Sequence, residues 1–572
     1  MHYRKGTIYV HHETSASFHQ ALELKCVLCV RLWVALEVSH ESELPAVGPT
    51  TYTVGPTFIN FESTRDRVAG KNTGERAALE FIVAQNNRCL KQHAACHRNK
   101  SANEFFPTRA IDVGSVTDPL VRLCERKDIT PGMRYASLSH CWGKTLLITL
   151  SKATASVLKR GIAVVTLPKT FQDAIAVTRE LQLQYLWIDS LCIFQDDPDD
   201  WRRESSRMRD VYRNAAFCIA ATAAKNGDVG LFFDRDPQLF GPIPMDLTWP
   251  EYEHKDSLRQ CNFPLLDDPW HIDAAPLNKR AWVAQERYLS PRILHFTRKL
   301  LYWECGETLA SEFHQDSHVR GQSSSRYLKG LVDRHRYHKP ASPRSVQNQL
   351  NITEPLETGE GKQAQVFNAW IYFRRFYTSC FLTRDSDILV ALHGIAEDVG
   401  EVMNDDLVVG LWRRRLSQDL CWRINPDSSK PFRPASWRGP SWSWVSSAQP
   451  INGRYFHQWP SDTFCKIGDI QVDTNSLGDM ILAVLILHCR LIPASKALGH
   501  KLDRDEPAPP GEEEKQYYMI ILHGDSFDGL LGPDSLYVSS VFVQSHHRIS
   551  HFRSLSPSTP KPTLSSAFET LH

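Results

Sequence analysis

Two hydrophobic periods alternate between residues 134 and 304, and this alternation constrains the fold more than any other feature of the chain. Short apolar runs of strand length are separated by longer segments in which apolar residues recur at helical spacing. The expected strands cover 134–139, 185–189, 216–222, 292–296 and 300–303. A succession of strand, helix and strand needs right-handed crossovers, which make neighbouring strands parallel. We therefore expect an α/β domain with a mainly parallel sheet and flanking helices.

The rest of the chain divides by composition, because 572 residues are too many for one ordinary core. Helical spacing, strand-like runs and polar stretches alternate on both sides of the α/β domain. The expected regions are a weakly patterned one at 1–75, a helical Cys/His segment at 76–130, the α/β domain at 131–304, a polar insertion or linker at 305–365, a helical region ending in PSWSW at 366–450, a β-rich region at 451–545 and a disordered tail at 546–572.

The charge balance excludes some classes of partner. Lys plus Arg is 66 and Asp plus Glu is 65, so nothing global points to a nucleic acid or an acidic membrane. The longest apolar run, 480–487, is far too short for a membrane span. The first residues lack the apolar core of a signal peptide, and the 14 cysteines are scattered. We expect reduced thiols and a cytoplasmic protein without a membrane span.

Polar side chains follow the first two expected strands directly. Ser139, His140 and Trp142 come at the end of the first strand, and Asp189 comes at the end of the second. Ligands of open parallel sheets bind beyond the carboxyl ends of the strands. We therefore expect these side chains to lie at the mouth of one crevice.

A helix expected at 279–289 carries a carboxylate on its apolar face. Trp282, Gln285, Glu286 and Leu289 are spaced so that they share one side of the helix. A carboxylate among buried apolar groups must be paired, hydrogen-bonded or raised in pKa, and such carboxylates are frequent at functional sites. We expect Glu286 to share the crevice with Ser139 and Asp189.

Each of these residues also has a structural interpretation. Asp189 could cap the turn that follows its strand. Glu286 could pair with Arg280 or Arg287. The remaining rings could simply be core residues: Trp142, Trp187, Trp282 and His140.

Cysteines and a histidine gather before the α/β domain. Cys26 and Cys29 have a spacing known from zinc ligands, but the nearest second group lies far along the chain. Buried reduced cysteines are common for packing reasons alone. Because the spacings match no compact zinc finger, we assign no metal, and the weak candidate ligands are Cys26, Cys29, Cys89, His93 and Cys96.

Three stretches together resemble the fungal heterokaryon-incompatibility (HET) domain. They are YASLSHCWG at 135–143, LWIDSLCIFQDD at 186–197 and NKRAWVAQERYLSPRILHF at 278–296. His140 stands where the family often has Tyr, and Phe194 stands where a polar residue is frequent. The resemblance implies a role in nonself recognition, in which the HET domain acts as an effector of programmed cell death. The implied partner is an allelic or nonself-sensing protein, with homo-oligomer formation on activation.

The resemblance also implies a chemistry. HET domains have been suggested to be distant relatives of TIR domains, which have a flavodoxin-like fold, and some TIR domains hydrolyse NAD. By that analogy Glu286 would hold the ribose hydroxyls and stabilise the oxocarbenium-like transition state, with Asp189 and Ser139 beside it. NAD would be a substrate and not a permanently bound cofactor. The implied binding residues are Trp142, which could stack on nicotinamide, His140, Trp282 and Gln285. No GxGxxG or P-loop motif is present, which disfavours ordinary Rossmann and NTPase functions.

Two other functions stay open. The same fold could be a non-catalytic signalling module, and the aromatic-rich PSWSWVSS at 440–447 would suit protein contacts. A cysteine-nucleophile hydrolase could use Cys141 or Cys192 with His140. That geometry is poor for Cys141, because adjacent strand residues point to opposite faces.

Overall fold

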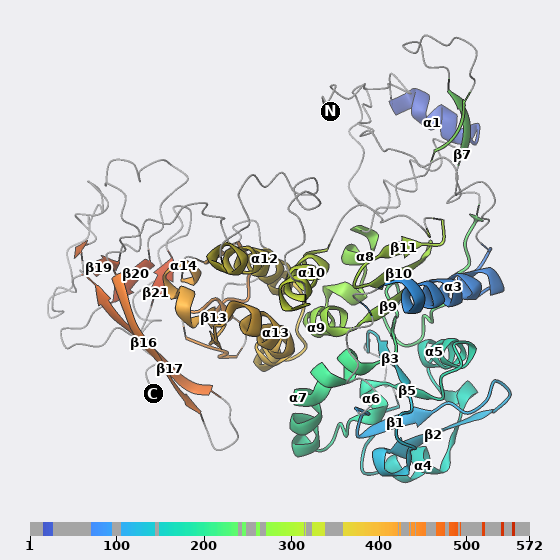
Figure 1. Cartoon of the computed structure of the whole chain (residues 1–572), viewed down its shortest axis with the longest axis horizontal. Coiled ribbons are helices and arrows are strands. Elements are labelled where there is room, and N and C mark those ends of the chain that lie inside the picture. Colours follow the sequence, from blue (N-terminus) through green and yellow to red (C-terminus); the bar gives the residue numbers. More distant parts are fainter. Residues whose placement is uncertain are drawn as a thin grey trace. The chain divides into compact units, whose positions relative to one another are not determined.

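The computed structural model divides into two compact units (Figure 1). The first unit comprises residues up to Asn278 together with Leu289–Ser323, and the second comprises Lys279–Tyr288 and residues from Ser324 onward. The structure describes residues 15–26, 70–93, 96, 105–143, 148–237, 243–247, 259–263, 270–313, 315, 323–337, 359–420, 422–424, 434, 436–440, 442–452, 465–474, 480–489, 492–493, 517–520, 539–542 and 552–554.

A nine-stranded mixed sheet forms the first unit, in the order β11-β10-β9-β6-β3-β5-β1-β2-β4. Its centre is parallel, because β3 pairs with β5 and β6, and β6 pairs with β9. The strands are β1 (Arg109–Asp112), β2 (Leu120–Glu125), β3 (Tyr135–Ser139), β4 (Ile162–Ala163), β5 (Tyr185–Trp187), β6 (Cys218–Ala220), β9 (Arg292–Phe296), β10 (Leu301–Cys305) and β11 (Leu309–Ser311).

The expectation of a mainly parallel sheet is wrong for the sheet as a whole. Within the described residues, the other five pairings of this sheet are antiparallel. The reason is connection length: β9, β10 and β11 follow one another through short turns, which can join only antiparallel neighbours. The four parallel strands do keep the flavodoxin-like order, since in chain order they lie 2-1-3-4.

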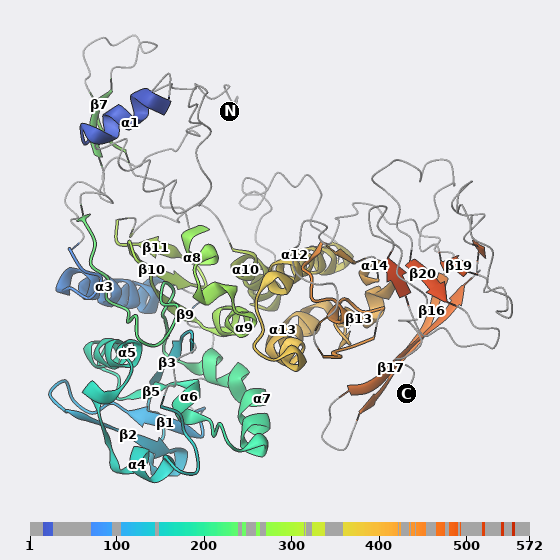
Figure 2. The same ribbon diagram turned by 180° about the vertical axis from the view of Figure 1, so that it is seen from behind.

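Two crossover helices flank the parallel centre. Helix α5 (Lys169–Glu180) connects β3 to β5, and α7 (Pro198–Asn214) connects β5 to β6 after the short α6 (Asp189–Cys192). In both views α5 and α7 lie on opposite sides of these strands (Figures 1 and 2). This is the arrangement that right-handed crossovers produce when the strand order reverses. Asp197 begins α7 by accepting hydrogen bonds from the amides of Asp199 and Asp200.

Helix α3 (Arg76–Gln92) precedes the sheet in the chain and packs on β10. Its buried face carries Ala78, Phe81, Ile82 and Cys89 at helical spacing. Short elements complete the unit: α1 (Ser15–Glu23), α4 (Ala155–Arg160), the β7–β8 hairpin (Ile243–Leu247 and Arg259–Phe263) and α8 (Trp270–Ala274).

Helices and small sheets form the second unit. Helices α10, α12 and α13 pack on one another, and Trp370 and Trp412 meet edge to face in their core with ring centroids 5.1 Å apart. The elements are α9 (Ala281–Leu289), α10 (Ser324–Tyr337), α12 (Gly359–Ser379), α13 (His393–Met403), β12 (Leu407–Val408), β13 (Leu411–Trp412), α14 (Leu416–Asp419), β14 (Arg423–Ile424), β15 (Ile451–Asn452), the hairpin β16 (Cys465–Thr474) with β17 (Met480–Cys489), and β18 (Ile492–Pro493), β19 (Tyr517–Ile520), β20 (Ser539–Phe542) and β21 (Phe552–Ser554).

Several regions expected from the sequence differ from the observed helices and strands. The stretch 305–365, expected to be a polar insertion, contains β11 and α10, and α10 buries Leu328, Leu331 and Val332 at helical spacing. Of the tail expected at 546–572, the structure describes only 552–554, which form β21; 546–551 and 555–572 lie outside the described residues. In the aromatic stretch at 440–447, Trp442 and Trp444 are buried, so these two rings are not exposed for protein contacts.

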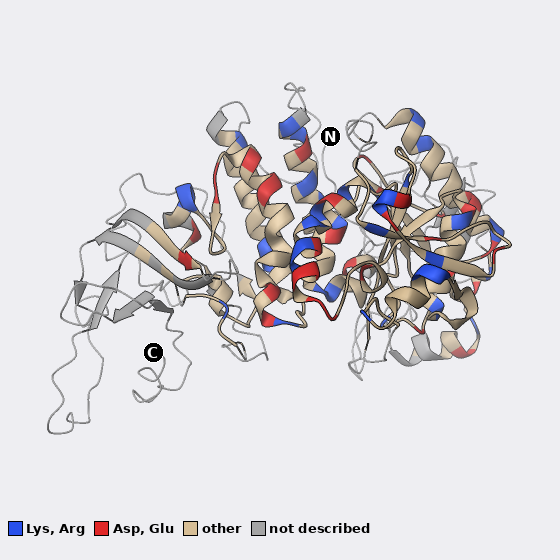
Figure 3. Ribbon diagram, turned by 90° about the horizontal axis from the view of Figure 1, so that it is seen from below, with Lys and Arg blue, Asp and Glu red and all other residues tan. Residues whose placement is uncertain are grey.

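The charges of the chain are mixed. Lys and Arg are interspersed with Asp and Glu along the described helices (Figure 3), in line with a net charge of +1. None of the helices in the described part of the chain is long and apolar enough to cross a membrane.

Candidate functional site

A polar cluster lies at the carboxyl ends of β3 and β5. The two strands are parallel neighbours, so the residues that follow them emerge at the same edge of the sheet. Nε1 of Trp142 donates a hydrogen bond to Oδ2 of Asp189 at 2.8 Å. Nδ1 of His140 lies 3.7 Å from Oδ1 of the same carboxylate. The structure therefore brings together His140, Trp142 and Asp189, as their positions in the sequence led us to expect.

Access to this cluster differs from residue to residue. The Asp189 side chain is 20% exposed, whereas that of His140 is 1% exposed. Ser139 is buried, and its hydroxyl has no hydrogen-bond partner among the described residues. His140 packs edge-on against Phe171 of α5, with ring centroids 5.0 Å apart. A ligand at this edge would meet the Asp189 carboxylate before it met the serine or the histidine.

Asp189 also begins α6. Its Oδ1 accepts a hydrogen bond from the backbone N–H of Ser190 at 2.7 Å. Asp189 is therefore the first residue of the helix and not its N-cap, which is Ile188, and no side chain caps α6. This carboxylate is held in place by the local fold whether or not a ligand binds.

Gly143 follows Trp142 and brings a third loop close to the cluster. Its φ is +74°, and a Cβ at this position would lie 2.4 Å from Cβ of Asn226, which follows β6. No side chain fits there, and most residues avoid that backbone conformation. The glycine of the CWG motif therefore lets the loops after β3 and β6 approach each other.

Helix α9 carries the other predicted residues and belongs to the second unit up to Tyr288. Glu286 is 4% exposed and Gln285 is 1% exposed. Oε1 of Gln285 accepts the backbone N–H of Gly394 at 2.9 Å, and Nε1 of Trp282 donates to Asp387 at 3.2 Å. Ser139, His140, Trp142 and Asp189 belong to the first unit. The two groups are thus built on different units.

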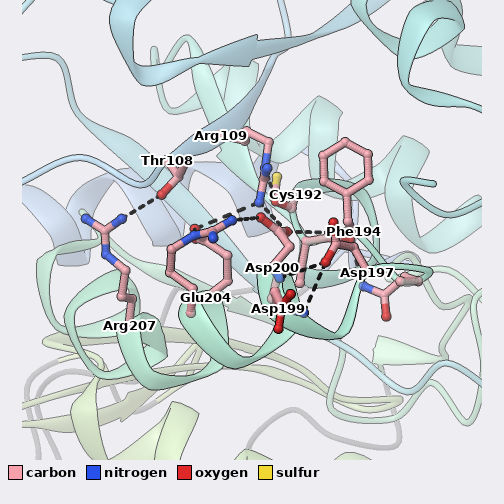
Figure 4. A network of polar contacts seen from close by, with 12 residues as sticks. Thr108, Arg109, Cys192, Phe194, Asp197, Asp199, Asp200, Glu204 and Arg207 are labelled. Atoms are coloured by element: carbon pink, nitrogen blue, oxygen red, sulfur yellow. Dashed lines mark hydrogen bonds and ion pairs between the residues drawn. The ribbon is translucent and has the colours of Figure 1, made fainter. Parts of the chain in front are cut away.

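A buried network accounts for the carboxylates that follow β5 (Figure 4). Arg109 at the start of β1 donates to Oδ2 of Asp200 and to the carbonyl oxygen of Cys192, each at 2.6 Å. The amide of Phe194 donates to the same carboxylate oxygen at 2.9 Å, and Arg203 binds the other oxygen. Burial alone would raise the pKa of Asp200, but these hydrogen bonds outweigh it and lower the pKa. Asp200 therefore fastens the start of α7 to β1.

A second buried chain crosses three neighbouring strands of the sheet. Oγ1 of Thr222 lies 3.1 Å from Nδ1 of His295, and Nε2 of His295 lies 3.1 Å from Oε2 of Glu304. The three residues follow or occupy β6, β9 and β10 and are all buried. We did not single them out from the sequence. The only available signal was a polar residue inside each apolar strand pattern, HF in RILHF and EC in LYWEC.

Three of the candidate metal ligands meet a fourth that the sequence did not suggest. Potential ligand atoms of Cys89, His93, Cys96 and Cys305 all lie within 4.8 Å of one another. Cys26 is not in this group, and Cys29 lies outside the described residues.

The cysteine-nucleophile alternative loses support. Cys192 is buried, and burial raises the pKa of its thiol to about 12. A thiol with so high a pKa is protonated at neutral pH and is a poor nucleophile.

One open hollow of about 590 Å³ lies at the opposite edge of the parallel strands. Gln184 and Asp112 line it; Gln184 directly precedes β5, and Asp112 is paired with the first residue of β5. This edge is the amino end of β5, where ligands of open parallel sheets do not usually bind.

The fold and the strand-end cluster define an α/β domain with polar groups gathered beyond two parallel strands. A family model described as heterokaryon incompatibility protein (HET) matches residues 135–286. The chain therefore carries a HET domain over these residues. No curated protein and no solved structure matches the chain.

Proposed function

We propose that this protein is a cytoplasmic effector of fungal nonself recognition that triggers cell death by hydrolysing NAD. The observation that carries the proposal is the cluster of His140, Trp142 and Asp189 beyond β3 and β5, in a domain that matches the HET family. The flavodoxin-like order of the parallel strands supports the analogy with TIR domains. An allelic or nonself-sensing protein would be the trigger, and assembly of several copies would activate the domain.

The proposed reaction breaks the bond between C1′ of the ribose and N1 of nicotinamide. Water adds to C1′, so the products are ADP-ribose, nicotinamide and one proton. Positive charge develops on the ribose ring in the transition state, and a nearby carboxylate stabilises it. By the analogy with TIR domains we give this role to Glu286, a buried carboxylate on α9.

The strand-end residues would bind and orient the substrate. Asp189 has the exposure needed to accept a hydrogen bond from a hydroxyl group. The indole of Trp142 offers a face for stacking on nicotinamide. Ser139 would supply a hydroxyl at the same edge of the sheet. Trp282 and Gln285 would support α9 through their bonds to Asp387 and Gly394.

Nicotinamide release from NAD by the purified full-length chain tests the proposal. The assay compares the wild type with Glu286→Gln and Asp189→Asn, in dilute solution and in a sample clustered by a fused oligomerisation tag. Glu304→Gln is the matched control, because Glu304 is also a buried glutamate, with 5% exposure, and is bonded to His295. We expect turnover by the wild type and Glu304→Gln, and at least about a hundredfold loss in Glu286→Gln.

A non-catalytic interaction module is the second candidate. It is favoured by the fact that both oxygens of Asp189 already have partners within the domain. Absence of turnover in every sample, with cell toxicity retained by the wild type and by Glu286→Gln, would establish this second function and overturn the first.

A further inference from the structure

Four side chains with metal-binding atoms converge where α3 meets β10. Cys89 lies in the last turn of α3, and His93 is the C-cap residue of the helix. Cys96 follows just beyond the helix end, and Cys305 is the last residue of β10. His93 and Cys305 are 212 positions apart in the chain. The stretch 89–96 therefore supplies three of the four residues, and the fold adds Cys305.

The chemistry of this group fits zinc. Three thiols and one imidazole form a Cys₃His set, which is a common ligand set of structural zinc sites. The ligand atoms lie within 4.8 Å of one another, and ligands about 2.3 Å from a tetrahedral zinc ion are about 3.8 Å apart. Nδ1 of His93 is 3.4 Å from Sγ of Cys305, so Nδ1 is the imidazole nitrogen that faces the thiols.

The guanidinium group of Arg292 contacts two of these ligand residues. Arg292 on β9 is paired with Cys305 in the strand register. Its Nε donates to Sγ of Cys89 at 3.3 Å, and its Nη2 donates to the carbonyl oxygen of Cys96 at 3.3 Å. A zinc ion with three thiolates carries one net negative charge, which the guanidinium would offset. Hydrogen bonds of this kind orient metal ligands and tune their basicity.

We propose that Cys89, His93, Cys96 and Cys305 bind one structural zinc ion. Each of the three thiols loses its proton on binding, and His93 binds as the neutral imidazole. Four protein ligands leave no open position for water or substrate, so the ion holds the fold and takes no part in catalysis. It would fasten the helix that precedes the HET domain to a strand that follows the matched region. The proposal is independent of the NAD chemistry assigned above.

Metal content of the purified full-length chain tests this site. After expression with zinc and gel filtration, we expect about one zinc ion per chain by mass spectrometry of the elements. Cys305→Ser and Cys89→Ser should lower the zinc content at least about tenfold. Cys124→Ser is the control, because Cys124 is a partly exposed thiol on β2 outside the group, and it should keep the ion.

Cobalt substitution gives a readout that does not depend on stability. The wild type with Co²⁺ should show thiolate-to-metal charge-transfer bands, and His93→Cys should keep the metal and intensify these bands, because a fourth thiolate replaces the imidazole. A wild-type chain without zinc and without these bands would overturn the proposal. So would a Cys305→Ser variant that keeps its zinc, or a disulfide between Cys89 and Cys305 in the freshly purified wild type.

Discussion

Trp142 donates its indole N–H to the carboxylate of Asp189, and this bond ties the loop after β3 to the first residue of α6. The two residues come from separate motifs of the HET domain and lie 47 positions apart. Their contact follows from the parallel pairing of β3 and β5, which brings both strand ends to one edge.

Replacing Trp142 with Phe removes this hydrogen bond and keeps an aromatic ring. We expect a loss of about 1.5–3 kcal/mol in the free energy of unfolding of the first unit, which is the usual contribution of a hydrogen bond to a charged group. Chemical denaturation measures it. Trp437→Phe is the control, because Trp437 is 56% exposed, and it should change the free energy of unfolding by less than about 0.5 kcal/mol. Equal effects of the two variants would contradict the assigned role of the bond.

Arg109→Met should be among the most damaging substitutions in the first unit. The side chains of Arg109 and Asp200 are 9% and 3% exposed, so losing the cation leaves a buried carboxylate uncompensated. We expect a cost of about 3–5 kcal/mol in the free energy of unfolding. The contrasting variant is Arg76→Met, since the side chains of Arg76 and Glu80 are 92% and 65% exposed, and solvent screening should leave the free energy of unfolding nearly unchanged.

A double variant separates the loss of the cation from loss of packing. Adding Asp200→Asn to Arg109→Met removes the uncompensated charge and should restore part of the stability. If the double variant were as unstable as the sum of the two single variants, the two residues would not be coupled.

The stability of the first unit should fall at acidic pH because of Asp200. Its pKa is lower in the folded protein than in the unfolded chain, so the folded state holds its proton less tightly. The stabilisation is complete above the ordinary pKa of Asp, about 3.9, and is lost as pH falls through the lowered value. The measurement is the free energy of unfolding against pH below about pH 4. Asp200→Asn should show a shallower dependence than the wild type, and an identical slope would contradict the assignment.

Gly143→Ala should destabilise the first unit for two separable reasons. The left-handed backbone conformation costs about 1–2 kcal/mol for alanine, and overlap with Asn226 adds about 1–3 kcal/mol. Gly132→Ala isolates the first cost, because Gly132 has a φ of +84° but no atom within 4 Å of the position of a Cβ. Thermal unfolding of both variants gives the difference, which Asn226→Gly should reduce in the Gly143→Ala background. Equal melting temperatures for Gly143→Ala and Gly132→Ala would contradict the close approach.

Local patterns predicted the centre of the sheet and not its edges. The apolar runs that became β3, β5, β6 and β9 were visible because strands buried on both faces are continuously hydrophobic. The antiparallel strands at both edges were not identified as such, because pairing direction depends on connections and not on hydrophobic period. The strand-end cluster was predictable for the same reason as the centre, since parallel strands end together.

Contacts between segments that are distant in the chain could not be predicted from the sequence. Arg109 lies ahead of the domain and gives no local sign that it binds Asp200, 91 positions away. Cys305 ends an apolar strand and looks like an ordinary core cysteine until α3 packs beside it. Spacing rules detect metal ligands that are close in the chain. They therefore selected Cys26 and Cys29 as candidates and could not select Cys305.

The pairing of the parallel strands determines which fragments of the chain can be expressed without exposed strand edges. The segment matched by the family model ends at 286, before β9, and begins after β1. A fragment with those limits would keep β5, β3 and β6 but lose the neighbours that pair with β5 and β6 on their outer sides. Both outer strands would then present bare backbone N–H and C=O groups, which are templates for aggregation. A fragment from the start of α3 through β11 keeps all nine strands of the sheet, so we expect it to aggregate less than a fragment limited to 135–286.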